Sequence, residues 1–286
     1  MTSAHGHEGL GGDWKLMRSR LEERRRLLGW ALGGGAVALL GACGGSGSVD
    51  TSSSSSSSSS SNTASSACVA DPAETNGPYP SDGTNTVNGT VSNVLLESGV
   101  VRSDIRSSFG GSTTTAPGVP LTLTITLENT NNSCGLLSGY AIYIWHCNRD
   151  GEYSLYGADV LNENYLRGVQ VTDSGGSVTF ETIFPACYSG RYPHIHVEVY
   201  PSLSVATSGN NALVITQLAM PRDIASTVYD TATGYSASVG NLAAVTTASD
   251  LVFDSSTTSQ LTAQTPSLSG NITDGYVATV TVGVGA

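Results

Sequence analysis

Positive charge is scarce in this chain. Residues 44–286 contain no lysine and only six arginines against 19 aspartates and glutamates, so their net charge is about −13. Nucleic acids and anionic lipid head groups are themselves strongly negative and are repelled by such a surface. We therefore predict no nucleic-acid partner, and membrane contact only through an anchor outside the folded domain.

Long apolar runs and phosphate-binding loops are also missing. The longest apolar stretch, residues 29–40, is too short to predict a membrane span. The chain has no glycine-rich phosphate loop, no internal repeat and no strong helical periodicity. These absences argue against a nucleotide-binding fold and against a helical-repeat architecture.

The first 43 residues have the pattern of an export signal. Three arginines at positions 24–26 precede the apolar stretch, and the segment ends in Leu-Gly-Ala-Cys at Cys43. The Arg-Arg-x-Leu-Leu arrangement resembles a twin-arginine signal, with an ordinary basic region as the alternative. The final four residues resemble a lipobox, in which Cys43 carries the lipid; the alternative is a plain signal with a chance cysteine. We expect an extracytoplasmic protein, lipid-anchored to a bacterial membrane surface or otherwise secreted.

Residues 44–67 are rich in glycine and serine, with unbroken serine over residues 52–61. Such a segment has little to bury and predicts a flexible linker. Residues 68–286 are long enough for one domain with a substantial core.

Four cysteines fall in this domain, an even number that suggests two disulfides in an exported protein. Cys134 and Cys147 are expected near opposite ends of one strand, about 40 Å apart if fully extended, which is too far for a bridge. The favoured pairing is Cys68 with Cys134 and Cys147 with Cys187.

The pattern of the domain is all-β. Stretches rich in β-branched and aromatic residues alternate with turn signals at short intervals, which is typical of a sandwich or barrel. A short helix or loop is expected in residues 222–244. The predicted strands cover residues 119–127, 140–145, 177–183, 195–200, 212–219 and 276–284.

A pair of histidines stands out within one of these strands. The chain has five histidines, and two of them, His194 and His196, are one residue apart in an apolar, β-branched run. Side chains at positions i and i+2 of a strand point to the same face, so both imidazoles can reach one metal ion. Tyr188 and Arg191 stand just upstream. Imidazole together with phenolate favours a hard, oxidised metal such as ferric iron over zinc.

Several spaced segments share their order with one known family. They are Glu74-Thr75-Asn76-Gly77-Pro78-Tyr79, Arg102-Ser103-Asp104-Ile105, residues 141–146, Gly151-Glu152-Tyr153, Arg167-Gly168, Thr172-Asp173, Phe184-Pro185-Ala186-Cys187-Tyr188 and Arg191-Tyr192-Pro193-His194-Ile195-His196. Together these segments resemble the intradiol ring-cleaving dioxygenases, which include catechol 1,2-dioxygenase and protocatechuate 3,4-dioxygenase. The resemblance runs from Cys68 to about residue 218.

The resemblance implies an immunoglobulin-like β-sandwich with long active-site loops that holds one non-haem Fe(III). It implies four metal ligands, namely Tyr153, Tyr188, His194 and His196. It further implies that Arg191 and Gln217 act in catalysis together with Tyr188, and that Tyr79 and Arg191 bind substrate. The implied reaction is the cleavage of a catechol by O2 to a cis,cis-muconate-type diacid, a step in aromatic catabolism.

Other readings of these residues stay open. Tyr156 is a nearby rival for Tyr153, and the spacing from Gly151 decides between them. His146 matches no ligand position and is expected to be structural, and Trp145 is expected in the core. For the whole chain the alternatives are a non-catalytic, surface-anchored binding module and a zinc or copper site that uses only the histidine pair.

The departures from the family pattern leave the metal ligands intact and affect the expected shape of the substrate. The family often has Pro-Gly-x-Tyr where this chain has Pro185-Ala186-Cys187-Tyr188, and a second aromatic where this chain has Pro80. The sequence predicts neither the preferred catechol nor the oligomeric state.

Overall fold

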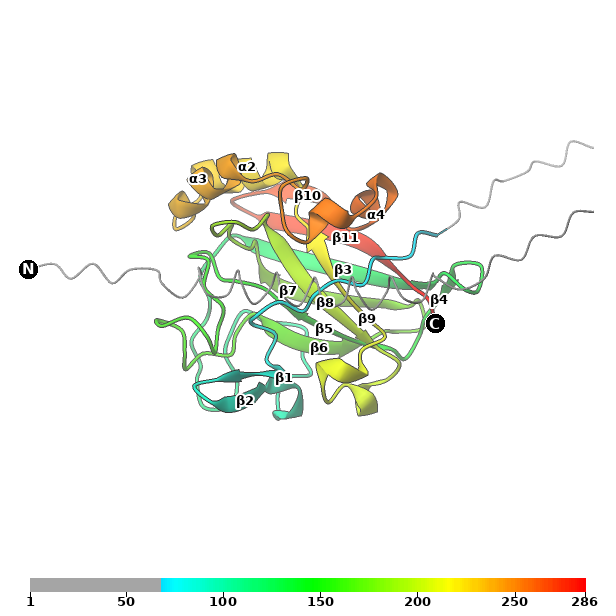
Figure 1. The fold of residues 1–286 in the computed structure, drawn as a ribbon. Coiled ribbons are helices and arrows are strands. Elements are labelled where there is room, and N and C mark those ends of the chain that lie inside the picture. The colour runs from blue at the N-terminus through cyan, green and yellow to red at the C-terminus, as the bar shows by residue number, and fades with distance from the viewer. Residues whose placement is uncertain (1–67) are drawn as a thin grey trace, which may run out of the picture.

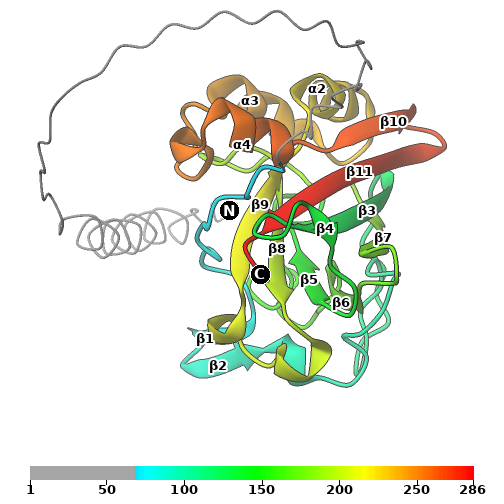
Figure 2. The ribbon, with the colours of Figure 1, turned by 90° about the vertical axis from the view of Figure 1, so that its right-hand side faces the viewer.

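The computed structural model describes residues 68–286. The predicted export signal, Cys43 and the Ser/Gly-rich linker lie outside the described residues. Two sheets pack face to face as a β-sandwich, the fold class that the sequence pattern predicts (Figures 1 and 2). In the residues described, no helix combines the length and the apolar character needed to cross a membrane.

One sheet is fully antiparallel and carries the histidine pair. Its strand order is β6-β5-β8-β9. The bounds are β5 (Ala141–Trp145), β6 (Arg167–Val171), β8 (His194–Tyr200) and β9 (Val214–Ala219).

The second sheet contains the parallel pair of β3 with the C-terminal strand β11. Its order is β10-β11-β3-β4, and β7 pairs with β3. The bounds are β3 (Pro120–Asn129), β4 (Gly135–Leu136), β7 (Ser177–Ile183), β10 (Ser267–Asn271) and β11 (Gly275–Val284).

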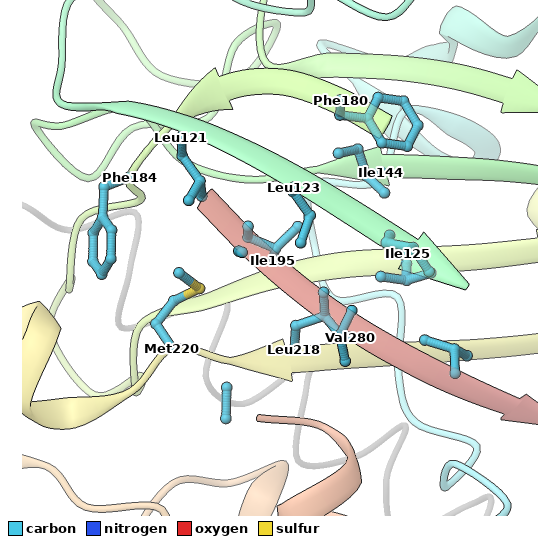
Figure 3. Packing of buried hydrophobic residues seen from close by; sticks show 14 of the residues in the cluster. Leu121, Leu123, Ile125, Ile144, Phe180, Phe184, Ile195, Leu218, Met220 and Val280 are labelled. Atoms are coloured by element: carbon cyan, nitrogen blue, oxygen red, sulfur yellow. The ribbon is translucent and has the colours of Figure 1, made fainter. Parts of the chain in front are cut away.

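The main core lies between the two sheets. In Figure 3 the side chains of Leu121, Leu123 and Ile125 on β3 point toward Ile195 on β8 and Leu218 on β9, and all of them are buried. These positions alternate with polar ones along β3, so the apolar residues at every second position form the inner face of the sheet. Burying each such side chain contributes about 1.5–3 kcal/mol.

Strand β8 is buried on both faces, which sets it apart from β3. Ile195, Val197 and Val199 point into the main core, so His194 and His196 point to the opposite side of the sheet. That side is covered by loops with a second apolar cluster, which includes Tyr143, Trp145 and Tyr153. The histidine pair therefore lies between a sheet and a layer of loops, away from bulk water.

Short elements lie at the two ends of the sandwich. The helices α2 (Arg222–Thr231), α3 (Ser236–Ala244) and α4 (Thr258–Ala263) gather at the end near β10. The hairpin of β1 (Asp82–Val87) and β2 (Thr90–Asn93) lies at the other end (Figures 1 and 2). Four 3-10 turns complete the described chain, at Val94–Leu96 (η1), Leu203–Val205 (η2), Gly209–Asn211 (η3) and Phe253–Ser255 (η4).

The structure contains one of the two predicted disulfides. Cys68 and Cys134 are bonded, whereas Cys147 and Cys187 are buried free thiols, so the predicted second bridge is wrong. The Cys147 thiol donates to the Ala186 carbonyl at 3.6 Å, and the Cys187 thiol donates to the Arg191 carbonyl at 3.4 Å. Burial raises the pKa of each thiol to about 12, so the reactive thiolate form is scarce.

We predict that Cys134→Ser lowers the free energy of unfolding by about 4 kcal/mol, because the bridge closes a loop with a sequence separation of 66 residues. Chemical denaturation of both proteins without reductant measures the difference. Thiol titration of the unfolded wild type should show two reactive groups from residues 68–286. If the described domain released none, Cys147 and Cys187 would be paired after all.

Candidate active site

The antiparallel pairing of β8 and β9 brings the first polar groups together. His196 pairs with Gln217, and His194 pairs with Ala219. On its other side His196 pairs with Trp145 of β5, and the two rings stack with centroids 4.5 Å apart at 6°. The sheet thus holds the His196 ring parallel to a buried aromatic surface.

Tyr153 reaches the histidines from the loop between β5 and β6. Gly151 has a φ of +90°, a left-handed conformation that favours glycine, and a Cβ there would lie 3.2 Å from the Tyr188 Cβ. Glycine is therefore favoured at position 151, where it lets the Tyr153 loop approach the Tyr188 loop. The Tyr153 and Tyr188 rings meet edge to face with centroids 5.9 Å apart.

Four donor atoms converge between these loops and β8. The Tyr153 hydroxyl lies 3.1 Å from His194 Nε2 and 3.2 Å from His196 Nε2. The two Nε2 atoms are 3.1 Å apart, and the Tyr188 hydroxyl lies 3.4 Å from His194 Nε2. Tyr156, the rival tyrosine, points elsewhere: its hydroxyl accepts from the Ser81 N–H and donates to Asn85.

The hydrogen bonds of the two imidazoles differ. His194 Nδ1 donates to the Tyr192 carbonyl at 2.6 Å, which leaves Nε2 as the atom with a free lone pair facing the cluster. His196 Nδ1 is buried and has no hydrogen-bond partner among the described residues. The ring of His196 is positioned by its stacking on Trp145 instead.

Burial controls the protonation of this cluster. Burial, followed by the Arg191 charge, lowers the pKa of His194 to about 3, and burial followed by the charge of His194 lowers the pKa of His196 well below its usual value. Burial raises the pKa of Tyr188 to about 12 and raises the pKa of Tyr153 well above its usual value. The imidazoles are thus neutral at pH 7 and can act as metal ligands, and the phenols lose their protons only when a strongly Lewis-acidic cation binds and lowers their pKa.

Arg191 places a fixed positive charge beside the donor atoms. Its Nη1 lies 3.4 Å from His194 Nε2, its Nη2 donates to Gln217 Oε1 at 2.6 Å, and its Nε donates to Asp250 Oδ2 at 2.8 Å. Gln217 in turn donates to the Thr75 carbonyl at 3.1 Å, so both ends of its amide have partners.

Tyr79 borders the donor cluster on the N-terminal side. Its ring centroid lies 5.1 Å from that of Tyr153. The buried guanidinium of Arg167 donates to the Tyr79 and Pro80 carbonyls and also to Ser154, next to Tyr153. Arg167 therefore ties the Tyr79 segment to the loop that carries Tyr153.

Sequence reasoning assigned no role to Trp145, Arg167 or Asp250 in this site. A buried arginine often pairs with a carboxylate, but that tendency does not select Asp250 from the 19 acidic residues in positions 44–286. His146, by contrast, has the structural setting expected from the sequence: its ring nitrogens contact the Cys147 carbonyl and the Thr182 hydroxyl.

The donor set fits a hard, trivalent cation. Two phenols and two imidazoles with lone pairs directed at one point are oxygen and nitrogen ligands, as ferric iron prefers. Donor atoms that share one first-row ion lie about 3 Å apart, since each metal–ligand bond is about 2 Å long, and the spacings here agree. Tyr153, Tyr188, His194 and His196 are the residues that would hold the ion.

Comparisons with known proteins agree with this architecture. Residues 104–237 match the dioxygenase family model Dioxygenase_C. An intradiol ring-cleavage dioxygenase from Tetranychus urticae is 22% identical with a TM-score of 0.56, over 76% of this chain and 95% of that chain. A second solved structure, a dioxygenase, is 22% identical with a TM-score of 0.57, over 76% and 94% of the two chains. No curated protein matches.

The β-sandwich fold is shared with a solved intradiol ring-cleavage dioxygenase. Residues 104–237 carry the similarity to the dioxygenase family model, and the solved structures that share the fold include an intradiol ring-cleavage dioxygenase. Members of this family generally depend on non-haem iron.

We predict that Tyr188→Phe weakens the visible absorption of the iron-loaded protein, because it removes one of the two phenols that would bind Fe(III). The absorption spectrum at equal iron content is the measurement. Tyr192→Phe is the matched control, since the Tyr192 ring packs against Phe253, 6.1 Å away, and its spectrum should equal that of the wild type. Equal spectra for wild type and Tyr188→Phe would remove Tyr188 from the ligand set.

Proposed function

We propose that this protein cleaves catechol-type aromatics between their two hydroxylated carbons with O2, using Fe(III), and yields cis,cis-muconate-type diacids. The observation that supports the proposal is the convergence of Tyr153, Tyr188, His194 and His196 within 3.1–3.4 Å. When bound, the ion supplies positive charge that holds the catechol as its dianion and activates it toward O2.

Tyr188 is the residue that we expect to move a proton. It is half-buried at the edge of the cluster, whereas Tyr153 is 3% exposed. Burial raises the pKa of Tyr188 to about 12 in the absence of a cation, so a Tyr188 phenolate that is not bound to the cation is basic enough to accept the proton of a substrate hydroxyl and to keep it.

Arg191 and Gln217 have different roles in stabilising negative charge on the substrate. The guanidinium faces the donor cluster from 3.4 Å and stabilises negative charge that develops on the substrate. Because both ends of the Gln217 amide are occupied, we assign Gln217 to positioning Arg191. Because the Tyr79 ring lies 5.1 Å from that of Tyr153, we expect Tyr79 to contact the aromatic ring of the substrate.

Oxygen uptake with catechol tests the reaction. The iron-loaded protein should consume one O2 per catechol and form a muconate without any yellow product. A yellow semialdehyde would mean that the ring is cleaved beside the two hydroxylated carbons rather than between them, and would contradict the proposal. No O2 uptake, with stoichiometric zinc or copper in the protein, would favour the site that uses only the two histidines.

We predict a preference for catechols without a negative substituent. Residues 68–286 hold six arginines and no lysine, and Arg191 is the cation placed at the donor cluster, where Asp250 already compensates its charge. The kcat/KM for catechol should exceed that for 3,4-dihydroxybenzoate by at least about tenfold, a difference of about 1.4 kcal/mol. Equal values would reveal a second cation at the mouth.

We also propose that the enzyme acts outside the cytoplasm, on aromatics that it meets at the cell surface. The support is the sequence pattern of residues 1–43 and the strongly acidic character of the rest of the chain. Fractionation of the producing cells, with mass analysis of Cys43, tests the location and the lipid.

A further inference from the structure

Asp250 is a fully buried carboxylate outside the stretch that matches the dioxygenase family model. It lies between α3 and the 3-10 turn η4 at Phe253–Ser255. Its Oδ1 accepts the backbone N–H groups of Val252 at 2.9 Å and Phe253 at 3.1 Å, which fixes the carboxylate to its own turn. The other oxygen, Oδ2, is directed at the loop that carries Arg191.

Asp250 Oδ2 binds two consecutive residues of that loop. It accepts Arg191 Nε at 2.8 Å and the Tyr192 backbone N–H at 2.7 Å. One oxygen thus holds both the side chain of Arg191 and the peptide that follows it. The Tyr192 carbonyl in turn accepts the Nδ1–H of His194, so hydrogen bonds connect Asp250 through Tyr192 to a proposed metal ligand.

The α3 helix fastens the same loop at a second place. The Ser238 hydroxyl accepts the Cys187 backbone N–H at 3.0 Å, and Asn241 Nδ2 donates to the Cys187 carbonyl at 2.8 Å. The segment from α3 to η4 therefore forms hydrogen bonds at two places with the loop that carries Tyr188 and Arg191. Of the two aspartates in this segment, Asp250 is buried and contacts the loop, whereas Asp254 is exposed.

We propose that Asp250 is a positioning residue, which holds the Arg191 guanidinium at the donor cluster and compensates its charge there. This inference rests on the proposed function. Arg191 is 2% exposed, and a buried guanidinium without a carboxylate is strongly unfavourable. With the carboxylate present, the guanidinium keeps its third nitrogen directed at His194 Nε2, and the pair adds little net positive charge beside a bound cation.

Asp250→Asn tests the charge while it conserves the shape. The unbalanced guanidinium should repel the cation and make bound Fe(III) easier to reduce. We expect iron affinity and kcat to fall about tenfold to a hundredfold, the usual range for groups that orient metal ligands. The phenolate-to-iron band should move to longer wavelength, with KM for catechol within about threefold of wild type. Asp254→Asn, an exposed aspartate four residues on, is the matched control and should change none of these.

Two results would overturn the inference while the proposed function stands. The first is a folded Asp250→Asn variant with wild-type iron affinity, band position and kcat. The second comes from the Arg191→Gln background, where adding Asp250→Asn should change kcat by less than about twofold if Asp250 acts through Arg191. A further tenfold loss there would mean that Asp250 acts independently of Arg191.

The double variant also covers the case in which Asp250→Asn alone does not fold. Neutral replacement of both members of a buried ion pair is usually tolerated, whereas loss of one is not, so Arg191→Gln/Asp250→Asn is compared with Arg191→Gln directly. If the wild type itself bound no iron and cleaved no catechol, that result would contradict the proposed function, and the role of Asp250 that rests on it would be withdrawn with it.

Discussion

His196→Ala should abolish catechol cleavage, with a loss of at least about a thousandfold in kcat, and the protein should no longer retain iron. His196 is 2% exposed and places Nε2 within 3.1–3.2 Å of His194 Nε2 and the Tyr153 hydroxyl, so its removal takes away one of four donors. A bound cation supplies several kcal/mol of charge stabilisation, and each 1.36 kcal/mol corresponds to a factor of ten in rate. Iron analysis of the purified variant and O2 uptake measure the two effects.

His146→Gln is the control for this substitution. His146 is also buried, but its ring contacts the Cys147 carbonyl and the Thr182 hydroxyl rather than the donor cluster. The control should lose stability but keep its iron and its kcat per folded molecule. Equal loss of iron in both variants would mean that general unfolding, and not ligand removal, explains the result for His196.

Arg191→Gln should lower kcat by about a hundredfold to a thousandfold, the usual cost of removing one preorganised group that stabilises developing charge. It should also destabilise the fold by about 3–5 kcal/mol, because Asp250 remains buried without its cation. Burial by itself would raise the pKa of Asp250, but the Arg191 charge lowers it overall, so Asp250 is ionised at neutral pH. Steady-state kinetics and denaturation measure the two effects separately.

Arg222→Gln is the matched arginine control. Its guanidinium donates to the Leu242 and Val245 carbonyls at 2.8 Å, at the end of α3, and it has no contact with the donor cluster. This control should be less stable than wild type with an unchanged kcat. If Arg191→Gln retained wild-type kcat, Arg191 would be a structural ion-pair residue and its catalytic assignment would be withdrawn.

The fold could be predicted where polar and apolar residues alternate clearly. The predicted strand at 177–183 coincides with β7, and residues 222–244, for which a short helix or a loop is expected, form α2 and α3. Five strands had no prediction, namely β1, β2, β4, β6 and β10. Two of them carry weak patterns: β4 has two residues, and β10 is the largely exposed run Ser-Leu-Ser-Gly-Asn. Their place in the sheet is set by pairing with β3 and β11, which is tertiary information.

The site shows the same division between local and distant information. His194 and His196 share a face because of the period of a strand, which the sequence displays directly. Tyr153 reaches them from 41 residues earlier and could be selected only through the Gly-x-Tyr resemblance. Asp250 lies 59 residues after Arg191, with no motif around it, so only the folded chain identifies this pair. The free thiols Cys147 and Cys187 show that an even cysteine count does not settle pairing.

Metal analysis of the purified protein, combined with its visible spectrum, tests the central claim most directly. We expect about one iron per chain and a broad visible band from tyrosinate bound to Fe(III), which bleaches on reduction. Colourless protein that contains stoichiometric zinc or copper, with Tyr153 and Tyr188 both protonated, would contradict the account.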